Sequence, residues 1–105
     1  MVRQFEVYLI SLDPTQGSEI RKTRPGLVIS PNEMNQTLKA VLVAPMTTSR
    51  RNFPSRVQTT FHGKKGEIAI DQIRAVDRSR LIKKLGAIHH TTAGKTLAVL
   101  QEMFS

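Results

Sequence analysis

A succession of short apolar segments, each ended by turn residues, most constrains the fold of this chain. We expect strands, rich in β-branched and aromatic residues, at 5–12, 25–30, 38–46, 55–61 and 67–71, with a weaker one at 81–88 broken near Gly86. Val7 and Leu9 are predicted to point into the core, and segment 25–30 to be buried on both faces. Strands this short favour a small, strongly twisted antiparallel barrel.

The last part of the chain has a different period. Apolar residues recur at helical spacing after residue 92, at Ala93, Leu97, Leu100 and Phe104. This stripe predicts a terminal helix with a hydroxyl N-cap among residues 90–92. We expect a polar connection at 31–37, a hairpin turn over HGKKG at 62–66 and a short helical turn at 72–77. The predicted fold class is mainly β with one C-terminal helix, in a single domain spanning residues 1–105.

Composition excludes several kinds of site. The chain has 105 residues and no cysteine, which removes disulfides, thiolate metal ligands and cysteine nucleophiles. No apolar run is long enough to span a membrane, and no signal-peptide cleavage pattern follows the N-terminus. Three histidines without clustered carboxylates do not suggest a metal site. We therefore expect a cytoplasmic protein that uses neither a metal nor another cofactor.

The charge distribution points to an anionic partner. The net charge is +8, and no acidic residue lies between Glu33 and Glu67, a stretch that holds Lys39, Arg50, Arg51, Arg56, Lys64 and Lys65. A basic surface on a small domain favours nucleic acid, the alternative being a solvated basic face. Lys64 and Lys65 are expected to be solvated charges at a hairpin tip. With one tyrosine and no tryptophan, stacking platforms are not expected to be the main binding device.

Two polar loops carry most of the side chains suited to chemistry. The loop at 12–25 contains the turn Asp13-Pro14, the carboxylate of Glu19 and the guanidinium of Arg24. Loops of this length in a small domain are usually functional or disordered, and an exposed polar loop is the plain alternative. The loop at 47–54 begins with two hydroxyls and continues with two arginines. We interpret these two loops as the candidate site.

Three segments together resemble one family. They are LDPTQGSE…RP after the first predicted strand, VAPMTT after the third and IDQIRAVDRSRL after the fifth. In order and spacing they are similar to the MazF/PemK (Kid) toxins of bacterial type II toxin–antitoxin systems, across essentially the whole chain. The resemblance implies a small SH3-like barrel of the CcdB/Kid/MazF type that acts as a homodimer.

The resemblance also implies a function and partners. The expected activity is sequence-specific, metal-independent endoribonuclease cleavage of single-stranded mRNA, which inhibits translation and growth. The expected protein partner is an antitoxin whose flexible acidic tail covers the RNA site. By resemblance, Arg24 matches the family's catalytic Arg, Thr47 its catalytic Thr, and Glu19 a carboxylate implicated in some members. We expect further RNA contacts from Thr15, Ser18, Arg21, Lys22, Thr48, Ser49, Arg50 and Arg51.

These residue types suit metal-independent RNA cleavage. The RNA 2′-OH can attack the adjacent phosphorus once its proton is removed, which leaves a 2′,3′-cyclic phosphate and a 5′-OH end. Arg24 would stabilise the phosphorane oxygens and carry the leaving-group proton, because a guanidinium matches two phosphate oxygens. Thr47 would orient the phosphate, and Glu19 would help to remove the 2′-OH proton. An ion pair from Glu19 to Arg24 or Lys22 is an alternative role.

The chain departs from the family pattern at several positions. Phe5 stands where a turn glycine is usual, and Ile20-Arg21-Lys22-Thr23 fill the space before the RP motif. Kid-like members use an Asp with an Arg two residues earlier, whereas here Asp71 follows Ala69, and Ser18 replaces a His. We therefore favour the roles of Arg24 and Thr47, and expect Asp71 to cap the turn at Gln72–Arg74.

Two other functions remain open from the sequence. One is a CcdB-like toxin that binds a protein on a similar barrel, and the other is a non-catalytic RNA-binding barrel. The segments GSE…RP and MTT favour the ribonuclease over the first, and the presence of Glu19, Arg24 and Thr47 favours it over the second.

Overall fold

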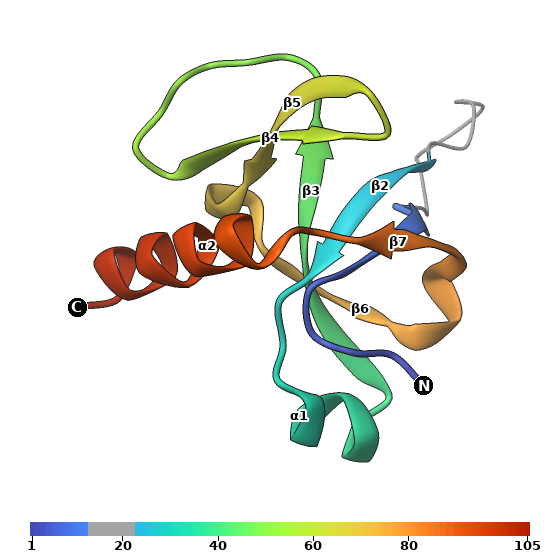
Figure 1. Cartoon of the computed structure of the whole chain (residues 1–105). Coiled ribbons are helices and arrows are strands. Elements are labelled where there is room, and N and C mark those ends of the chain that lie inside the picture. The colour runs from blue at the N-terminus through green and yellow to red at the C-terminus, as the bar shows by residue number, and fades with distance from the viewer. Residues whose placement is uncertain (13–22) are drawn as a thin grey trace, which may run out of the picture.

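The computed structural model describes residues 1–12 and 23–105 (Figure 1). In chain order the strands of this part are β1 (Glu6–Ser11), β2 (Thr23–Val28), β3 (Ala40–Thr47), β4 (Arg56–Phe61), β5 (Lys64–Ala69), β6 (Arg74–Asp77) and β7 (Leu81–Ala87). The helices are α1 (Asn32–Thr37), the 3₁₀ turns η1 (Ile70–Gln72) and η2 (Arg78–Arg80), and α2 (His90–Met103).

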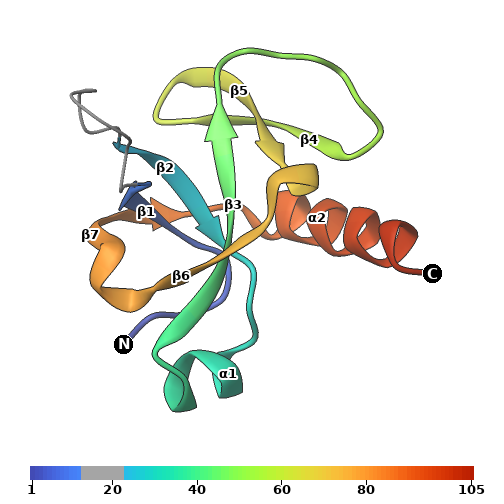
Figure 2. The ribbon, with the colours of Figure 1, turned by 180° about the vertical axis from the view of Figure 1, so that it is seen from behind.

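Strand β3 is the centre of the sheet. The strand order is β4-β5-β3-β2-β1-β7, every neighbouring pair is antiparallel, and β6 pairs with the first half of β3. Figures 1 and 2 show β3 running from α1 to the β4–β5 hairpin. The strongly twisted sheet and the C-terminal helix confirm the predicted mainly β barrel.

The core consists of two apolar clusters on opposite faces of the sheet. Alternate residues of β3 enter each one, which explains why its sequence is continuously apolar. The first cluster contains Val7, Leu27, Ile29, Ala44, Met46, Val57, Ile68 and Ile70, and the second contains Ile10, Val28, Val41, Val43 and Val76. Val7 is buried as predicted, but Leu9 is only half-buried, and Ile10 takes the inward place on the opposite face.

The segment at 31–37, predicted as a connection, contains the short helix α1. Pro31 precedes the helix with the φ of −68° that its ring imposes. Asn35 is fully buried, accepts a hydrogen bond from Ser30 Oγ (2.5 Å) and donates one to the Ser30 carbonyl (3.0 Å). Turn-type residues therefore form a helical turn here because a buried side-chain amide finds both partners in the same segment.

A helical turn was predicted at 72–77, but Arg74–Asp77 form the strand β6 and only Gln72 belongs to a turn. The 3₁₀ turn lies earlier, at η1, and β6 pairs with β3, with Val76 opposite Val41. Val76 is 3% exposed, so its burial in the second cluster overrides the weak local preference. Asp77 then accepts a hydrogen bond from the Ser79 amide (2.9 Å) and caps η2.

The β4–β5 hairpin turn is shorter than predicted. Only His62 and Gly63 lie outside the strands, and both have left-handed φ values (50° and 78°). Gly66 is therefore a strand residue, and a Cβ there would collide with the carbonyl of Thr47. Phe5, where the resemblance expects a turn glycine, also has a left-handed φ of 71° while its ring packs on the first cluster.

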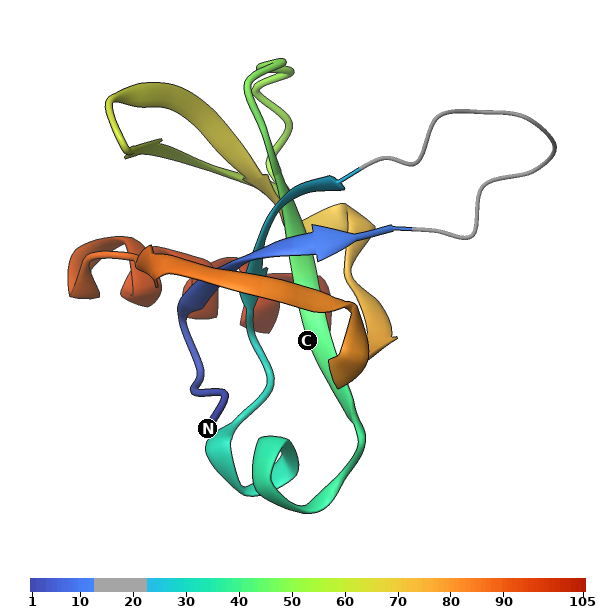
Figure 3. The same ribbon diagram turned by 90° about the vertical axis from the view of Figure 1, so that its right-hand side faces the viewer.

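Helix α2 confirms the predicted terminal helix and half of its apolar stripe, since Ala93 is buried and Leu100 packs on the first cluster, but it does not confirm the predicted cap. It packs against β4 and η1, and Figure 3 shows it crossing beneath the β4–β5 hairpin. Ala93 and Thr96 are buried, whereas Leu97 is 43% and Phe104 76% exposed. The N-cap is His89, whose Nδ1 accepts from the Thr91 amide (3.3 Å), in place of a hydroxyl. In the described residues no helix is long and apolar enough to cross a membrane.

Candidate active site

Arg24 and Thr47 meet at the end of the β2–β3 pair. Gly26 is opposite Pro45 in this antiparallel ladder, so the same register continued by two residues places Arg24 level with Thr47. Both residues line one small cavity, of about 120 Å³, together with Pro45, Ser49, Arg51, Arg56, Ala69 and Gln72. We call this cavity the cationic pocket, because three arginines border it.

The cationic pocket contains part of the predicted site. Arg24, Thr47, Ser49 and Arg51 line it, as expected for residues that act on one group. Two predicted RNA contacts lie elsewhere: Thr48 borders an adjoining cavity, and Arg50 borders a shallow depression with residues of β4, β5 and α2. Thr15, Ser18, Glu19, Arg21 and Lys22 lie outside the described residues.

Thr47 occupies a defined position. It is the last residue of β3 and pairs with Glu67 of β5. Its Oγ1 accepts a hydrogen bond from the Ser49 amide (3.1 Å), which turns the chain away from the strand. Since the oxygen is the acceptor in this contact, the hydroxyl proton stays available for donation to a ligand.

Glu67 ties the loop after Thr47 to β5. Its side chain is fully buried. The two carboxylate oxygens accept hydrogen bonds from the backbone amides of Arg51 (3.0 Å) and Asn52 (2.8 Å). They also accept from Arg56 Nη1 (3.0 Å) and Gln58 Nε2 (2.5 Å). Four donors thus satisfy one buried carboxylate and place Arg51 beside Thr47.

The same contacts keep Glu67 ionised. Burial alone opposes the charged form and raises the pKa of a carboxyl group. Hydrogen bonds from Arg51, Gln58, Asn52 and Arg56 outweigh burial and lower the pKa of Glu67 to about 2. The buried negative charge therefore persists at neutral pH behind the cationic pocket.

Arg56 joins Glu67 to Asp71. Its Nε and Nη2 donate to the two oxygens of Asp71 (2.7 and 3.3 Å), and Ser55 Oγ donates to Asp71 Oδ1 (2.9 Å). The bidentate contact is the main cause of the lowered pKa of Asp71. Asp71 therefore forms an ion pair instead of the predicted cap at Gln72–Arg74, since η1 has no side-chain cap.

The pairing determines which cations can bind a ligand. Arg56 has two carboxylate partners, a 6% exposed side chain and a guanidinium 5.2 Å from the centre of the Phe53 ring. Within residues 1–12 and 23–105, Arg24 and Arg51 have no carboxylate partner. The pocket can thus hold an anion between two unpaired guanidinium groups and the Thr47 hydroxyl.

The Glu67–Arg56–Asp71 network was not predicted from the sequence. Prediction of the correct two-residue turn at 62–63 would have revealed it, because this turn places Gln58 opposite Glu67 and Arg56 opposite Ala69. The signal was an acidic residue at the end of an acid-free stretch, directly before the apolar residues Ile68, Ala69 and Ile70.

The histidines have other contacts. His62 stacks on Phe61 with ring centres 4.1 Å apart, and His89 caps α2 and lies against His90. Among the described residues no three His, Cys, Asp or Glu side chains gather in a way that would hold a metal ion.

The class of protein follows from a match to a known family. Residues 3–104 match the PemK-like, MazF-like toxins of type II toxin–antitoxin systems. The chain belongs to this family.

Individual relatives agree with this assignment. The endoribonuclease MazF of Staphylococcus epidermidis is 34% identical over 91 residues, which are 81% of this chain and 76% of the relative. MazF from Deinococcus radiodurans has the same fold, with a TM-score of 0.81 at 24% identity over 98% of this chain and 96% of that one. A mycobacterial endoribonuclease in complex with its cognate antitoxin matches with a TM-score of 0.81 at 25% identity, over 95% of this chain and 91% of that one.

Proposed function

We propose that this toxin is a sequence-specific, metal-independent endoribonuclease that cleaves single-stranded mRNA and so stops translation. The observation that carries the proposal is the meeting of Arg24 and Thr47 at one pocket, with Arg51 beside them. The 34% identical relative is itself an endoribonuclease. A pocket lined by guanidinium groups and a hydroxyl suits a phosphodiester.

In the proposed mechanism the scissile phosphate lies in the cationic pocket. The 2′-oxygen attacks phosphorus as its proton leaves to a base, a role we assign to Glu19. Arg24 and Arg51 stabilise the charge on the phosphorane oxygens, and the Thr47 hydroxyl donates a hydrogen bond to one of them. The bond to the 5′-oxygen breaks, Arg24 delivers a proton to that oxygen, and the products carry a 2′,3′-cyclic phosphate and a 5′-OH.

The remaining predicted partners belong to the same proposal. Solved relatives include complexes with cognate antitoxins. We infer that a cytoplasmic antitoxin with an acidic tail inhibits this chain by placing carboxylates against Arg24 and Arg51. We also propose that the active form is a homodimer, and that Thr48, Arg50 and residues of the 13–22 segment, Thr15, Ser18, Arg21 and Lys22, extend the RNA contact.

The proposal is tested by incubating the protein with a long single-stranded RNA in EDTA. The native protein should cut at discrete sequences. Arg24→Ala should cut at least about 100-fold more slowly, the loss typical of one oxyanion-stabilising donor. Arg74→Ala, an exposed arginine of β6 outside the pocket, is the matched control and should cut at the native rate. No cleavage by the native protein would contradict the proposal and favour a non-catalytic or protein-binding toxin.

A further inference from the structure

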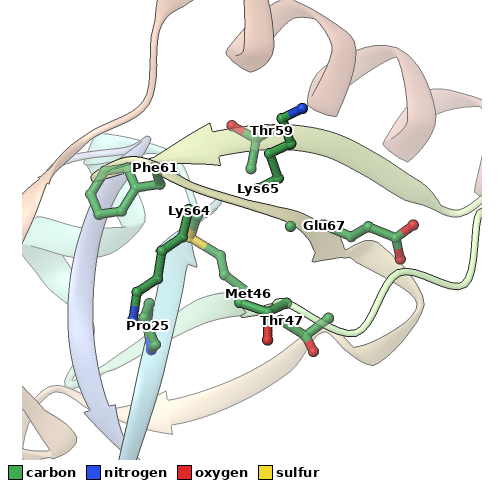
Figure 4. Close-up of a pocket in the computed structure, with 10 residues that line it drawn as sticks. Pro25, Met46, Thr47, Thr59, Phe61, Lys64, Lys65 and Glu67 are labelled. Atoms are coloured by element: carbon green, nitrogen blue, oxygen red, sulfur yellow. The ribbon is translucent and has the colours of Figure 1, made fainter.

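A second cavity adjoins the cationic pocket and has no role in the proposed chemistry. It lies on the β4–β5 side of Thr47 and has a volume of about 160 Å³. Figure 4 shows its main walls: Pro25 of β2, Met46 and Thr47 of β3, Thr59 and Phe61 of β4, and Lys64 of β5. We call it the side cavity.

The walls of the side cavity are mostly apolar. Met46 is 8% exposed and belongs to the first core cluster, and the half-buried Phe61 packs against the same cluster. One ring face of Phe61 is covered by His62. Val57, Thr59 and Phe61 alternate along β4, so the Thr59 hydroxyl is on the same strand face as the buried Val57.

Six polar residues border the side cavity, and the carboxylate of one of them, Glu67, is already satisfied by its four donors. Among the described residues, neither the Thr59 hydroxyl nor the Lys64 ammonium has a hydrogen-bond or ion-pair partner. Lys64 is on the same strand face as Gly66 and Ile68, and Figure 4 shows its side chain extending toward Pro25. The cavity thus offers apolar walls with two hydrogen-bond donors, a combination typical of small-ligand sites.

The volume limits what can enter. Cavities of about 150 Å³ in other proteins accept a benzene molecule, whereas drug-sized ligands need roughly 300 Å³ or more. A single six-membered ring therefore fits the side cavity, and a larger fused system would project from it.

The two cavities share a wall. Thr47 lines both, and Pro25 of the side cavity follows Arg24 of the cationic pocket in the chain. A ligand with its phosphate between Arg24 and Thr47 would therefore place an attached ring at the side cavity. A nucleotide of RNA is such a ligand.

We propose that the side cavity binds one pyrimidine base next to the scissile phosphate and so contributes to the sequence specificity of cleavage. This inference rests on the proposed function. Phe61 and Met46 contact the faces and edges of the base, and Lys64 and Thr59 donate hydrogen bonds to its carbonyl oxygens. Loss of these donors removes the preference for a pyrimidine at that position without removing the groups that act on phosphate.

The test is a map of cleavage sites in a randomised RNA library. With the native protein, a pyrimidine should be preferred at one of the two nucleotides that flank the cut. Thr59→Val and Lys64→Met should each lower that preference at least about 5-fold and leave preferences at other positions unchanged. Thr60→Val is the matched control, because Thr60 is the exposed neighbour on β4 and does not line the cavity.

A binding measurement gives an independent result. An RNA of the preferred sequence with a 2′-deoxy residue at the cut is not cleaved, and removal of the flanking base should weaken its binding about 10-fold. Phe61→Leu, confirmed as folded by its thermal transition, should reduce this difference.

Three results would count against the inference. If Thr59→Val and Lys64→Met both cleave with an unchanged pyrimidine preference, this inference is wrong and the proposed function stands. The same holds if the RNA lacking the flanking base binds as tightly as the complete RNA. Absence of cleavage by the native protein would overturn the proposed function and this inference together.

Discussion

The buried carboxylate of Glu67 accepts a hydrogen bond from the backbone amide of Asn52 at 2.8 Å. Asn52 has a left-handed φ of 57°, so the contact stabilises a backbone conformation that most residues avoid. The adjoining amide of Arg51 donates to the same carboxylate (3.0 Å). The conformation of the loop that carries the unpaired Arg51 therefore depends on a side chain of the neighbouring strand.

The first prediction concerns the charge of Glu67. Glu67→Gln replaces an oxygen that accepts two of these hydrogen bonds with an NH₂ group, which leaves buried donors facing each other. We expect a melting temperature lower by at least about 5 °C and faster amide exchange in residues 50–53. Glu102→Gln, at the exposed end of α2, should change neither. Native-like exchange in the loop of Glu67→Gln would show that Glu67 does not hold it.

The second prediction concerns acid stability. The pKa of Glu67 is about 2 in the folded protein against 4.5 as its ordinary value. The unfolded chain thus binds this proton more readily, so the stabilisation is complete above about pH 4.5 and is lost as the pH falls toward 2. Between pH 5 and 2 the free energy of unfolding of Glu67→Gln should fall less steeply than that of the native protein. Equal slopes measured by urea unfolding would contradict this prediction.

The third prediction concerns the close approach of β5 to Thr47. Gly66→Ala puts a Cβ against the Thr47 carbonyl, which is backbone and can move only if Thr47 moves. We expect cleavage to slow at least about 10-fold while the fold is retained, because small displacements of catalytic groups are costly. Gly94→Ala is the control, because nothing lies near its added Cβ. It should keep the native cleavage rate and stabilise α2 by about 1 kcal/mol. A native cleavage rate for Gly66→Ala would contradict the assigned position of Thr47.

The fourth prediction concerns the contact of Arg51 with RNA phosphate. Arg51 is unpaired within the described residues and lines the cationic pocket, so it should contact phosphate. In titrations with an uncleavable single-stranded RNA, Arg51→Ala should reduce the salt dependence of log K by about 0.7. Arg74→Ala should leave the slope unchanged. An unchanged slope for Arg51→Ala would exclude the phosphate contact.

Much of the fold followed from local pattern. The continuous apolar run at 38–46 predicted the central strand, because both of its faces are buried between the two clusters. Strand β6 was missed because Val76 is its only buried residue, and its conformation is decided by pairing with β3, where Val76 lies opposite Val41. Leu97 and Phe104 of the α2 stripe are exposed for a related reason. Helical periodicity identifies apolar residues on one face but does not tell which of them pack against the core.

The site divided along similar lines. Arg24 and Thr47 were predicted from the motifs RP and MTT, and their common place at the cationic pocket follows from the β2–β3 register. Glu67 was missed because its importance depends on four donors that lie 9 to 16 residues away along the chain. Such a network arises from strand pairing, and the predicted turn at 62–66, three residues too long, shifted that pairing and hid it.

The most direct test of the central claim is the chemistry of the cleaved ends. A short RNA with one cleavage site is treated in EDTA beside the same RNA with a 2′-deoxy residue immediately 5′ of the cut. We predict a 2′,3′-cyclic phosphate on one fragment, a 5′-OH on the other, and no cut in the deoxy substrate. Cleavage of the deoxy substrate, or fragments with a 5′-phosphate, would contradict attack by the 2′-oxygen on a phosphate held between Arg24 and Thr47.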